Sequence, residues 1–508
     1  MNSLTGKQIS FWIDSAPDTT FPALSHDVIV DVAIVGGGIA GITTAKLLKK
    51  MGKTVAIVES KKIAEGVSGH TTAKVTSLHQ LIYADLLKNL GLEKATVYAE
   101  SNQAALERVA TFVKDEQIDC DFSRRSAYTF AESEQGLENI EQEYKAALKL
   151  GLPAHFVTDT SLPFSVTGAV RFDHQAQFHP RKYLLHLAQS IQGEGSYVFE
   201  DTKVTNVEEE KTFCQVMTDR GTVMAKNVVI ATHLPILDSG LFFAKTSPKR
   251  SYIVGARINP TSAPEGMFIG SGKSYFSIRT TPSPDGLLLL VGGGGHKVGE
   301  VSDTEEQYRM VENYVRDRFA IETFDYRWST QDMVSCDQLP YIGQLSPHSQ
   351  IYVATGFGLW GMTKGTLSGM ILSDLILGNN NAWASLYDST RLTPLITPKA
   401  VKQTISVGMH WVGDRLKGLS STDSSPALSD VAIGEAKLVT VDGEKMAAYR
   451  DDDGVMHIVS AVCSHLGCIV AWNNAEKSWD CPCHGSRFNC QGEVLNAPAV
   501  KDLKVHHI

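Results

Sequence analysis

The 508-residue chain lacks a long hydrophobic run. Its longest mainly apolar stretches, at residues 287–291 and 370–377, fall well short of the roughly 18 apolar residues that a membrane-spanning helix needs. The first 22 residues include Asp14 and Asp18 and contain neither a continuous apolar segment nor a twin-arginine pair, so they do not have the pattern of a secretory signal. We therefore expect no membrane span and a cytoplasmic location.

An excess of positive charge is also missing. The chain has 47 Lys and Arg residues against 56 Asp and Glu residues, which gives a formal net charge of −9. No cluster of basic residues stands out along the sequence. Because binding to nucleic acids and to anionic membranes depends on such clusters, we expect neither as a partner.

Cysteine is scarce and unevenly placed. Of the 8 cysteines, three are scattered through the chain, and the other five lie between residues 463 and 490. In a long chain without a secretion signal, such crowding is more typical of a metal or redox site than of a disulfide framework.

The start of the chain predicts a βαβ unit. Residues 28–35 form a β-branched run that ends at Gly36, as expected for a buried strand. Residues 42–51 have the pattern of a helix, and residues 55–59 have that of a second strand. Such a unit predicts an open parallel sheet.

Further along, strand and helix patterns alternate, which predicts a second lobe interleaved with the first. We expect helices at 104–114, 137–150, 305–318 and 366–377, and strands at 198–207, 223–231, 251–258, 275–280 and 287–291.

Residues 379–425 are rich in Asn, Pro and Ser, which is typical of a domain boundary. We therefore predict a first domain at 1–395, a linker at 396–426 and a second domain at 427–508, with a short amphipathic helix at 401–416.

A glycine motif lies between the first strand and the first helix. Gly36, Gly38 and Gly41 occupy the glycine positions of G-x-G-x-x-G, and Glu59 ends the next strand. In this context the glycines let the backbone approach a pyrophosphate, and the acidic side chain accepts hydrogen bonds from ribose hydroxyls. The motif predicts a dinucleotide site but does not separate NAD from FAD.

Four later segments resemble the FAD-dependent D-amino-acid oxidase family, with its glycine oxidase and sarcosine oxidase relatives. They are EGVSGHTTAK at 65–74, VIATH at 229–233, DQLPYIG at 337–343 and GFGLWGMT at 356–363. The resemblance covers roughly residues 28–390. It implies bound FAD and an α/β, Rossmann-like FAD-binding domain with an interleaved α+β substrate lobe.

Together with the glycine motif, the resemblance implies a set of residues at the FAD. They are Gly36, Gly38, Ile39, Ala40, Gly41, Glu59, His70, Thr71, Thr72, Val204, Ala231, Thr232, Gly356, Gly358, Met362 and Thr363. At the place of His70, some dehydrogenases of the superfamily carry a histidine bonded covalently to the flavin.

A pattern of cysteine and histidine follows near the C-terminal end. Its two runs are Cys463-Ser464-His465-Leu466-Gly467-Cys468 and Cys481-Pro482-Cys483-His484-Gly485-Ser486. Cysteine and histidine at close spacing also bind zinc, so the spacing alone leaves a zinc site open. The second run, with the later Gly492 and Pro498, resembles the Rieske domain.

The Rieske resemblance implies a small all-β domain that holds a [2Fe-2S] cluster. It places Cys463 and Cys481 on one iron and His465 and His484 on the other. It also implies a disulfide between Cys468 and Cys483, and it leaves Cys490 without a role.

Two residues are candidates for the catalytic site. Arg279 matches by position an arginine that glycine-oxidase-like enzymes present to the substrate carboxylate, and the alternative is an ion pair between lobes. His296 follows a run of four glycines and is a candidate acid or base near the flavin, with a structural histidine as the alternative.

These features predict an FAD-dependent oxidoreductase. It would oxidise a small-molecule amine or amino acid and pass electrons through the Rieske cluster to an external acceptor. The alternative is a flavin and iron–sulfur electron carrier that acts on a redox partner and has no small-molecule substrate. An NAD(P)H reductase would ordinarily need a second dinucleotide motif, and only one is present. No His/His/carboxylate set for mononuclear iron is evident, so we do not expect Rieske oxygenase chemistry.

Overall fold

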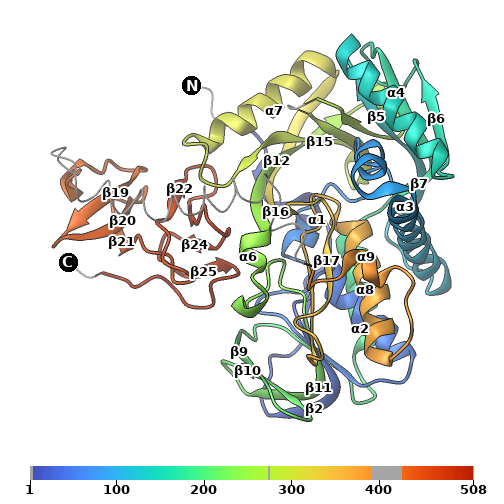
Figure 1. Ribbon diagram of the computed structural model, residues 1–508. Helices are drawn as coiled ribbons and strands as arrows, with labels where there is room; N and C mark the ends of the chain where they lie inside the picture. Colours follow the sequence, from blue (N-terminus) through green and yellow to red (C-terminus); the bar gives the residue numbers. More distant parts are fainter. Residues whose placement is uncertain (1–3, 273–274, 392–425, 507–508) are drawn as a thin grey trace.

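The computed structural model describes residues 4–272, 275–391 and 426–506. Two interleaved lobes are formed by the blue to orange part of the chain, and the red C-terminal part forms a small unit of strands beside them (Figure 1). The predicted linker and the predicted helix at 401–416 lie outside the described residues, apart from Pro426. The domain boundaries therefore stay predictions.

The first lobe is built on an eight-stranded sheet with the order β17-β18-β11-β2-β3-β8. Its strands β8, β3, β2, β11 and β18 run parallel, and β17 is antiparallel to β18. The bounds are β2 (Val28–Val35), β3 (Val55–Val58), β8 (Tyr197–Phe199), β11 (Thr222–Ile230), β17 (Tyr341–Gln344) and β18 (Ile351–Thr355), with β9 (Val204–Glu209) and β10 (Cys214–Thr218) attached to β11. Every residue of β3 and β18 is buried, as expected for central strands covered on both faces.

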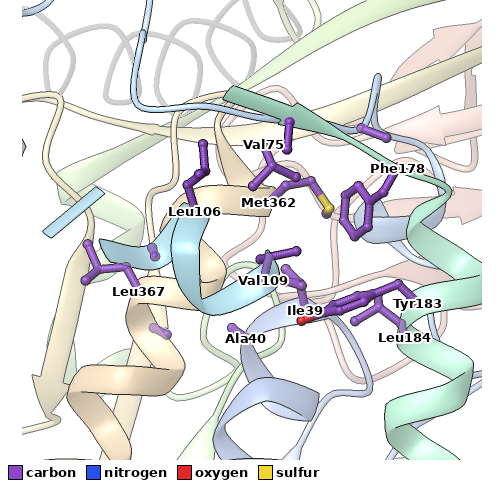
Figure 2. Close-up of a cluster of buried hydrophobic side chains, with 14 of the residues drawn as sticks. Ile39, Ala40, Val75, Leu106, Val109, Phe178, Tyr183, Leu184, Met362 and Leu367 are labelled. Atoms are coloured by element: carbon purple, nitrogen blue, oxygen red, sulfur yellow. The ribbon is translucent and has the colours of Figure 1, made fainter. Parts of the chain in front are cut away.

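Four helices of the first lobe pack against one another where the second helix begins. They are α2 (Ile39–Lys50), α3 (Tyr83–Asp115), α5 (Pro180–Ile191) and α8 (Gly361–Leu377). Figure 2 shows Ile39 and Ala40 of α2 in one apolar cluster with residues of the other three helices. Helices α2 and α8 approach so closely that a Cβ on Gly365 would lie 2.5 Å from Ile39 Cγ2. This packing fixes the position of the first turn of α2.

The second lobe is built on a ten-stranded sheet with the order β1-β16-β12-β15-β14-β13-β5-β7-β4, to which β6 adds beside β7. The long strands β12, β15 and β16 are antiparallel neighbours and form the part of the sheet next to the C-terminal unit (Figure 1). The bounds are β1 (Lys7–Gln8), β4 (Lys74–Val75), β5 (Ser123–Ala131), β6 (Ala154–Val157), β7 (Gly168–Gln177), β12 (Thr246–Ile258), β13 (Met267–Gly270), β14 (Ser277–Ser283), β15 (Gly286–Lys297) and β16 (Ile321–Ser335).

The remaining helices lie mainly beside this second sheet. They are α1 (Phe11–Asp14), α4 (Glu134–Lys149), α6 (Phe242–Lys245), α7 (Thr304–Arg318) and α9 (Ala384–Tyr387). Asp303 caps α7, since its carboxylate accepts hydrogen bonds from the amides of Glu305 and Glu306. Within residues 4–272, 275–391 and 426–506, no helix has both the length and the apolar character needed to cross a membrane.

The C-terminal unit contains two small antiparallel sheets. One has the order β19-β20-β21 and the other has the order β22-β23-β24-β25. The bounds are β19 (Ala436–Val441), β20 (Glu444–Arg450), β21 (Met456–Ser460), β22 (Ala471–Asn473), β23 (Ser478–Asp480), β24 (Arg487–Asn489) and β25 (Val494–Asn496). The predicted fold class, an α/β nucleotide-binding lobe with an interleaved second lobe and an all-β domain, is confirmed.

Several predicted elements differ from those of the structure. The strand expected at 198–207 is two strands, β8 and β9, which lie in different parts of the sheet. The chain turns between them because the buried carboxylate of Glu200 accepts a hydrogen bond from Ile63 N at 2.7 Å, and Thr202 Oγ1 accepts one from Leu24 N at 3.0 Å. The helix expected at 104–114 is the second half of α3, whose helical geometry is interrupted at Gly91.

Candidate functional site

A cavity of about 700 Å³ is lined by residues of both lobes and of the C-terminal unit. Twelve of the sixteen residues expected at the FAD line this cavity. They are Gly36, Gly38, Ile39, Ala40, Glu59, His70, Thr71, Thr72, Val204, Ala231, Thr232 and Met362. The cavity therefore brings together the glycine motif, the end of β3 and segments more than 300 residues further along the chain.

The other four residues lie outside the cavity lining. They are Gly41, Gly356, Gly358 and Thr363. A Cβ on Gly41 would lie 2.1 Å from Gly36 O, so this glycine allows the first turn of α2 to lie against the loop. Thr363 Oγ1 accepts a hydrogen bond from Thr76 N at 3.1 Å and donates one to Thr76 O at 2.8 Å. These contacts join α8 to the segment that carries Thr71 and Thr72.

The glycine loop fits a dinucleotide. Gly37 N donates to Glu59 Oε2 at 2.8 Å, which ties the loop to the end of β3. Gly38 precedes the first turn of α2, and the nearest atom to a Cβ placed on it is Ser68 Oγ at 3.1 Å. The helix N-terminus thus meets the cavity with no bulky side chain in front of it, which is the arrangement that accepts a pyrophosphate. Glu59 would hold the ribose hydroxyls of the FAD.

The cavity wall also includes a buried lysine, Lys74, to which the sequence analysis gave no role. Lys74 Nζ donates to Phe268 O at 2.7 Å and to Ser277 Oγ at 2.5 Å. Burial lowers the pKa of Lys74 well below its usual value, and the nearby Arg279 lowers it further. Lys74 ends the EGVSGHTTAK segment, but no local pattern shows that it is buried, since its partners lie on strands about 200 residues away.

A histidine and a carboxylate also face each other on this wall. His233 Nε2 lies 3.4 Å from Asp332 Oδ1, and both residues line the cavity. Asp332 Oδ2 also accepts a hydrogen bond from Leu359 N at 2.8 Å, so it holds the loop before α8. Tyr275 and Trp360 complete this part of the lining.

The two candidate catalytic residues lie away from the cavity lining. Arg279 is 1% exposed, and its Nη1 donates to Ala73 O at 2.7 Å and to Thr72 O at 3.2 Å. His296 lies 3.0 Å from the hydroxyl of Tyr252, at the contact with the C-terminal unit. Arg279 is thus placed to hold the 72–73 segment, because backbone carbonyls rather than the cavity take its donors.

In the C-terminal unit, two loops bring the expected cluster ligands together. Cys463 and His465 follow β21, and Cys481 and His484 follow β23. The rings of His465 and His484 have centroids 5.0 Å apart and stand at 90° to each other. Burial, reinforced by His465, lowers the pKa of His484 to about 3, which keeps its imidazole in the neutral form that binds metals.

The thiols of this site also fit iron. A hydrogen bond from Cys481 is the main cause that lowers the pKa of the Cys463 thiol, against the effect of burial, and one from Ser486 adds to it. The thiolate is the form that binds a metal. Both ring nitrogens of His484 are buried and have no hydrogen-bond partner within the described part of the chain. Two thiols and two imidazoles are the donor set that a Rieske cluster uses.

A disulfide joins Cys468 to Cys483 and ties the two loops together. The Sγ atoms of these two residues and of Cys481 lie within 4.8 Å of one another. Because a disulfide removes two of these sulfurs as thiolate ligands, the three do not form a metal site of their own. Cys490 lies outside the group, with its Sγ 3.1 Å from Gln491 Oε1.

The loop with Cys481 and His484 is docked on the second lobe. Arg250 Nη2 donates to Asp480 Oδ2 at 2.8 Å, and both side chains are buried. Burial by itself raises the pKa of Asp480, but Arg250, aided by Arg487, holds it at about 2. At the other end of the loop, Gln331 Nε2 donates to Gly485 O at 2.7 Å. Both ends of the loop are therefore fixed.

The docked loop leaves little space between the two units. A Cβ on Gly485 would lie 2.4 Å from Gln331 Nε2, and a Cβ on Gly299 would lie 2.5 Å from Pro482 Cβ. The ring of Phe243, on α6, meets the ring of His484 edge to face at a centroid distance of 5.2 Å. One glycine on each side thus permits the close approach of the candidate cluster site to the cavity wall.

Comparison with known proteins gives a family for each part of the chain. The model of the FAD dependent oxidoreductase family matches residues 31–375, and that of the Rieske [2Fe-2S] domain matches residues 425–507. A Rieske 2Fe-2S iron–sulfur protein of Bacillus subtilis (strain 168), YhfW, is 35% identical over 500 residues, which are 97% of each chain.

Other relatives match the two lobes. The gamma-glutamylputrescine oxidoreductase of Escherichia coli (strain K12) is 24% identical over 380 residues, or 71% of this chain and 86% of that protein. The crystal structure of glycine oxidase from Geobacillus kaustophilus covers 72% of this chain and 99% of its own, with a TM-score of 0.61 and 19% identity. These findings agree with the cavity and the docked cluster loops. The chain belongs to the FAD dependent oxidoreductase family and carries a Rieske [2Fe-2S] domain at its C-terminal end.

Proposed function

We propose that this oxidoreductase oxidises an amine or amino acid in the cavity and passes the electrons through the Rieske cluster to an external acceptor. The FAD supplies an acceptor for a hydride, and the cluster supplies one-electron transfer. The sixteen residues expected at the FAD would hold or support it, and Cys463, Cys481, His465 and His484 would bind the two irons.

The docked cluster loop carries this proposal. Gln331 lines the cavity and donates a hydrogen bond to Gly485, the residue that follows His484. A side chain of the cavity wall therefore contacts the loop that bears two of the candidate ligands. An accessory module without a part in electron transfer would not need this contact, since any part of its surface could face the lobes.

The substrate class is supported by the far part of the cavity and by the relatives. Asp332 brings a carboxylate to this wall, which suits a small molecule that carries an amino group. A gamma-glutamylputrescine oxidoreductase and a glycine oxidase are among the similar proteins. We further propose that Arg279 is a positioning residue for the 72–73 segment.

Anaerobic mixing with a panel of amines and amino acids tests the first half of the proposal. We expect one compound class to bleach the flavin absorbance. If only dithionite or a protein donor bleaches it, the protein is an electron carrier without a small-molecule substrate, and the proposal is wrong.

The second half is tested with His484→Ala. Flavin reduction by substrate should stay nearly unchanged, whereas steady-state turnover with a one-electron acceptor should fall by orders of magnitude, because the variant lacks a candidate cluster ligand. His457→Ala is the matched control, since His457 lies in the same domain and its Nε2 contacts Asp451 at 2.7 Å. Wild-type turnover of His484→Ala with every acceptor would show that the cluster is not in the electron path.

A further inference from the structure

We propose that the Rieske domain supplies part of the FAD-binding site, so that the flavin is held between the lobes and the C-terminal domain. The cavity that carries the glycine motif is also lined by Glu476, Arg487, Asn496 and Val500. These residues come from the turn after β22, from β24, and from β25 and the segment after it. Electron transfer requires the cluster loop to lie near the flavin, but it does not require residues of β24 and β25 to line the same cavity.

Glu476, Arg487, Asn496 and Val500 form what we call the C-terminal wall of the cavity. This wall lies beside the part of the cavity that is expected to hold the nucleotide. Lys203 Nζ lies 3.6 Å from Asp502 Oδ1, so the segment that follows β25 meets the residue before Val204. Lys203 and Val204 both line the cavity, and Thr202 N donates to Glu59 O at 3.0 Å. The C-terminal wall is therefore next to the residues expected at the ribose and not only next to the substrate part.

The charge of this region suits a dinucleotide. Lys61, Lys203 and Arg487 line the cavity, and they come from both domains. Cationic side chains stabilise a ligand that carries two negative phosphate charges. Arg487 is itself held by Asp480, at 3.0 Å from Nε to Oδ1, so its place on the wall is fixed.

Buried polar contacts hold the wall in position. Besides the Arg250 and Asp480 ion pair, Thr304 Oγ1 donates to Asn473 Oδ1 at 2.7 Å, and Tyr308 donates to Glu476 Oε1 at 2.9 Å. Breaking one partner of a buried ion pair leaves an uncompensated charge and strongly disfavours the docked state. If FAD contacts both sides, docking and FAD binding must strengthen each other.

Hydrogen exchange of the full-length protein with and without FAD tests the proposal directly. We expect FAD to slow amide exchange in 494–502 as well as in 36–41. Residues 436–450 of β19 and β20 lie outside the cavity lining and provide an internal control. Protection confined to the lobes, with none in 494–502, would overturn the proposal. No substrate is used, so this result is independent of the proposed reaction.

Flavin release provides a second test. Arg250→Met removes the ion pair from the lobe side, and we expect FAD to dissociate about tenfold faster because the docked state is disfavoured. Arg257→Met is the matched control. It lies on the same strand, and its pair with Asp325, 2.8 Å from Nη2 to Oδ2, stays within the lobe. Release of FAD at the wild-type rate from Arg250→Met would contradict the proposal.

Discussion

Two glycines of the same motif have different functions. A Cβ on Gly41 would meet Gly36 O at 2.1 Å, a backbone atom that cannot move without breaking the loop. A Cβ on Gly38 would meet only the hydroxyl of Ser68, at 3.1 Å. Gly41 is thus required by the packing of the protein. At Gly38 the protein leaves open space in front of the helix, as a bound pyrophosphate would need.

Gly38→Val should therefore leave a folded protein that does not retain FAD. Gly41→Val should lower the melting temperature or prevent folding, because overpacking against backbone typically costs about 1–3 kcal/mol or more. Flavin absorbance and thermal unfolding of the purified variants separate the two effects. Normal flavin content in Gly38→Val would contradict the placement of the pyrophosphate at this loop.

Gln331 is the residue that joins the cavity wall to the cluster loop. Its Nε2 donates to Gly485 O at 2.7 Å, and its Oε1 accepts from Arg250 Nη2 at 3.1 Å. Both contacts are buried, so the side chain holds the cluster loop against the cavity wall.

Gln331→Met keeps the length of the side chain and removes both hydrogen bonds. We expect electron transfer from flavin to cluster to slow by at most about fivefold, which is the limit set by the loss of about 1 kcal/mol from the buried hydrogen bond to Gly485. Photoreduction of the flavin, followed by the cluster absorbance, measures this rate. Gln177→Met is the control, since Gln177 is buried in the same sheet and donates to Thr280 O at 3.0 Å. Equal slowing in both variants would rule out a specific role for Gln331.

At the scale of elements, the start of α3 depends on a carboxylate from α4. Glu143 is fully buried, and its two oxygens accept hydrogen bonds from Tyr83 N at 2.8 Å and Ala84 N at 2.9 Å. Burial raises the pKa of Glu143 from 4.5 to about 7, although these bonds oppose the shift. The helix α3 thus begins at a group whose charged form is disfavoured in the folded protein.

A raised carboxyl pKa makes stability fall as the pH rises. In the unfolded chain Glu143 loses its proton near its ordinary pKa of 4.5, and in the folded protein it does so only near pH 7. The stabilisation that comes from protonated Glu143 is therefore fully present below the unfolded pKa and is lost as the pH rises to the folded pKa. Relative to Glu143→Gln, the wild-type free energy of unfolding should drop by on the order of 2 kcal/mol between pH 5 and pH 8. Urea titrations across this range measure the difference.

Glu138→Gln is the control for this prediction. Glu138 is exposed on the same helix, α4, and the variant should keep the wild-type pH profile. A profile of Glu143→Gln that runs parallel to that of the wild type would contradict the assignment of this pH dependence to Glu143.

At the scale of the whole molecule, two cysteines of the Rieske domain should differ in their effect on the cluster. Cys463→Ser should lose the cluster, as shown by iron analysis and by the electron paramagnetic resonance of the reduced protein. Cys490→Ser should keep it, because Cys490 contacts Gln491 and lies outside the ligand set. Zinc in place of iron in protein made under iron-replete conditions, or cluster loss in both variants, would contradict the assigned ligands.

Local motifs were sufficient to predict the two cofactors and the family. Gly36, Gly38 and Glu59 meet in one cavity because strand, turn and helix follow one another directly in a βαβ unit. The ligand loops were predictable for the same reason, since each holds its cysteine and histidine within a few residues. The sequence did not show that Arg279 and His296 lie outside the cavity lining, because the position of a residue on a strand does not reveal which groups its side chain will hydrogen-bond in the folded protein.

The sequence by itself thus determined the two cofactors and the family, through residues whose spacing along the chain is set by the chemistry of the ligand. Only the tertiary structure decided how the two parts meet. Gln331 and Gly485 are 154 residues apart, and Arg250 and Asp480 are 230 residues apart. Contacts between residues so far apart leave no periodic or local pattern in the sequence, because they depend on how two separately folded domains pack against each other. For this reason the shared cavity wall, and the flavin site divided between two domains that we infer from it, could be read only from the fold.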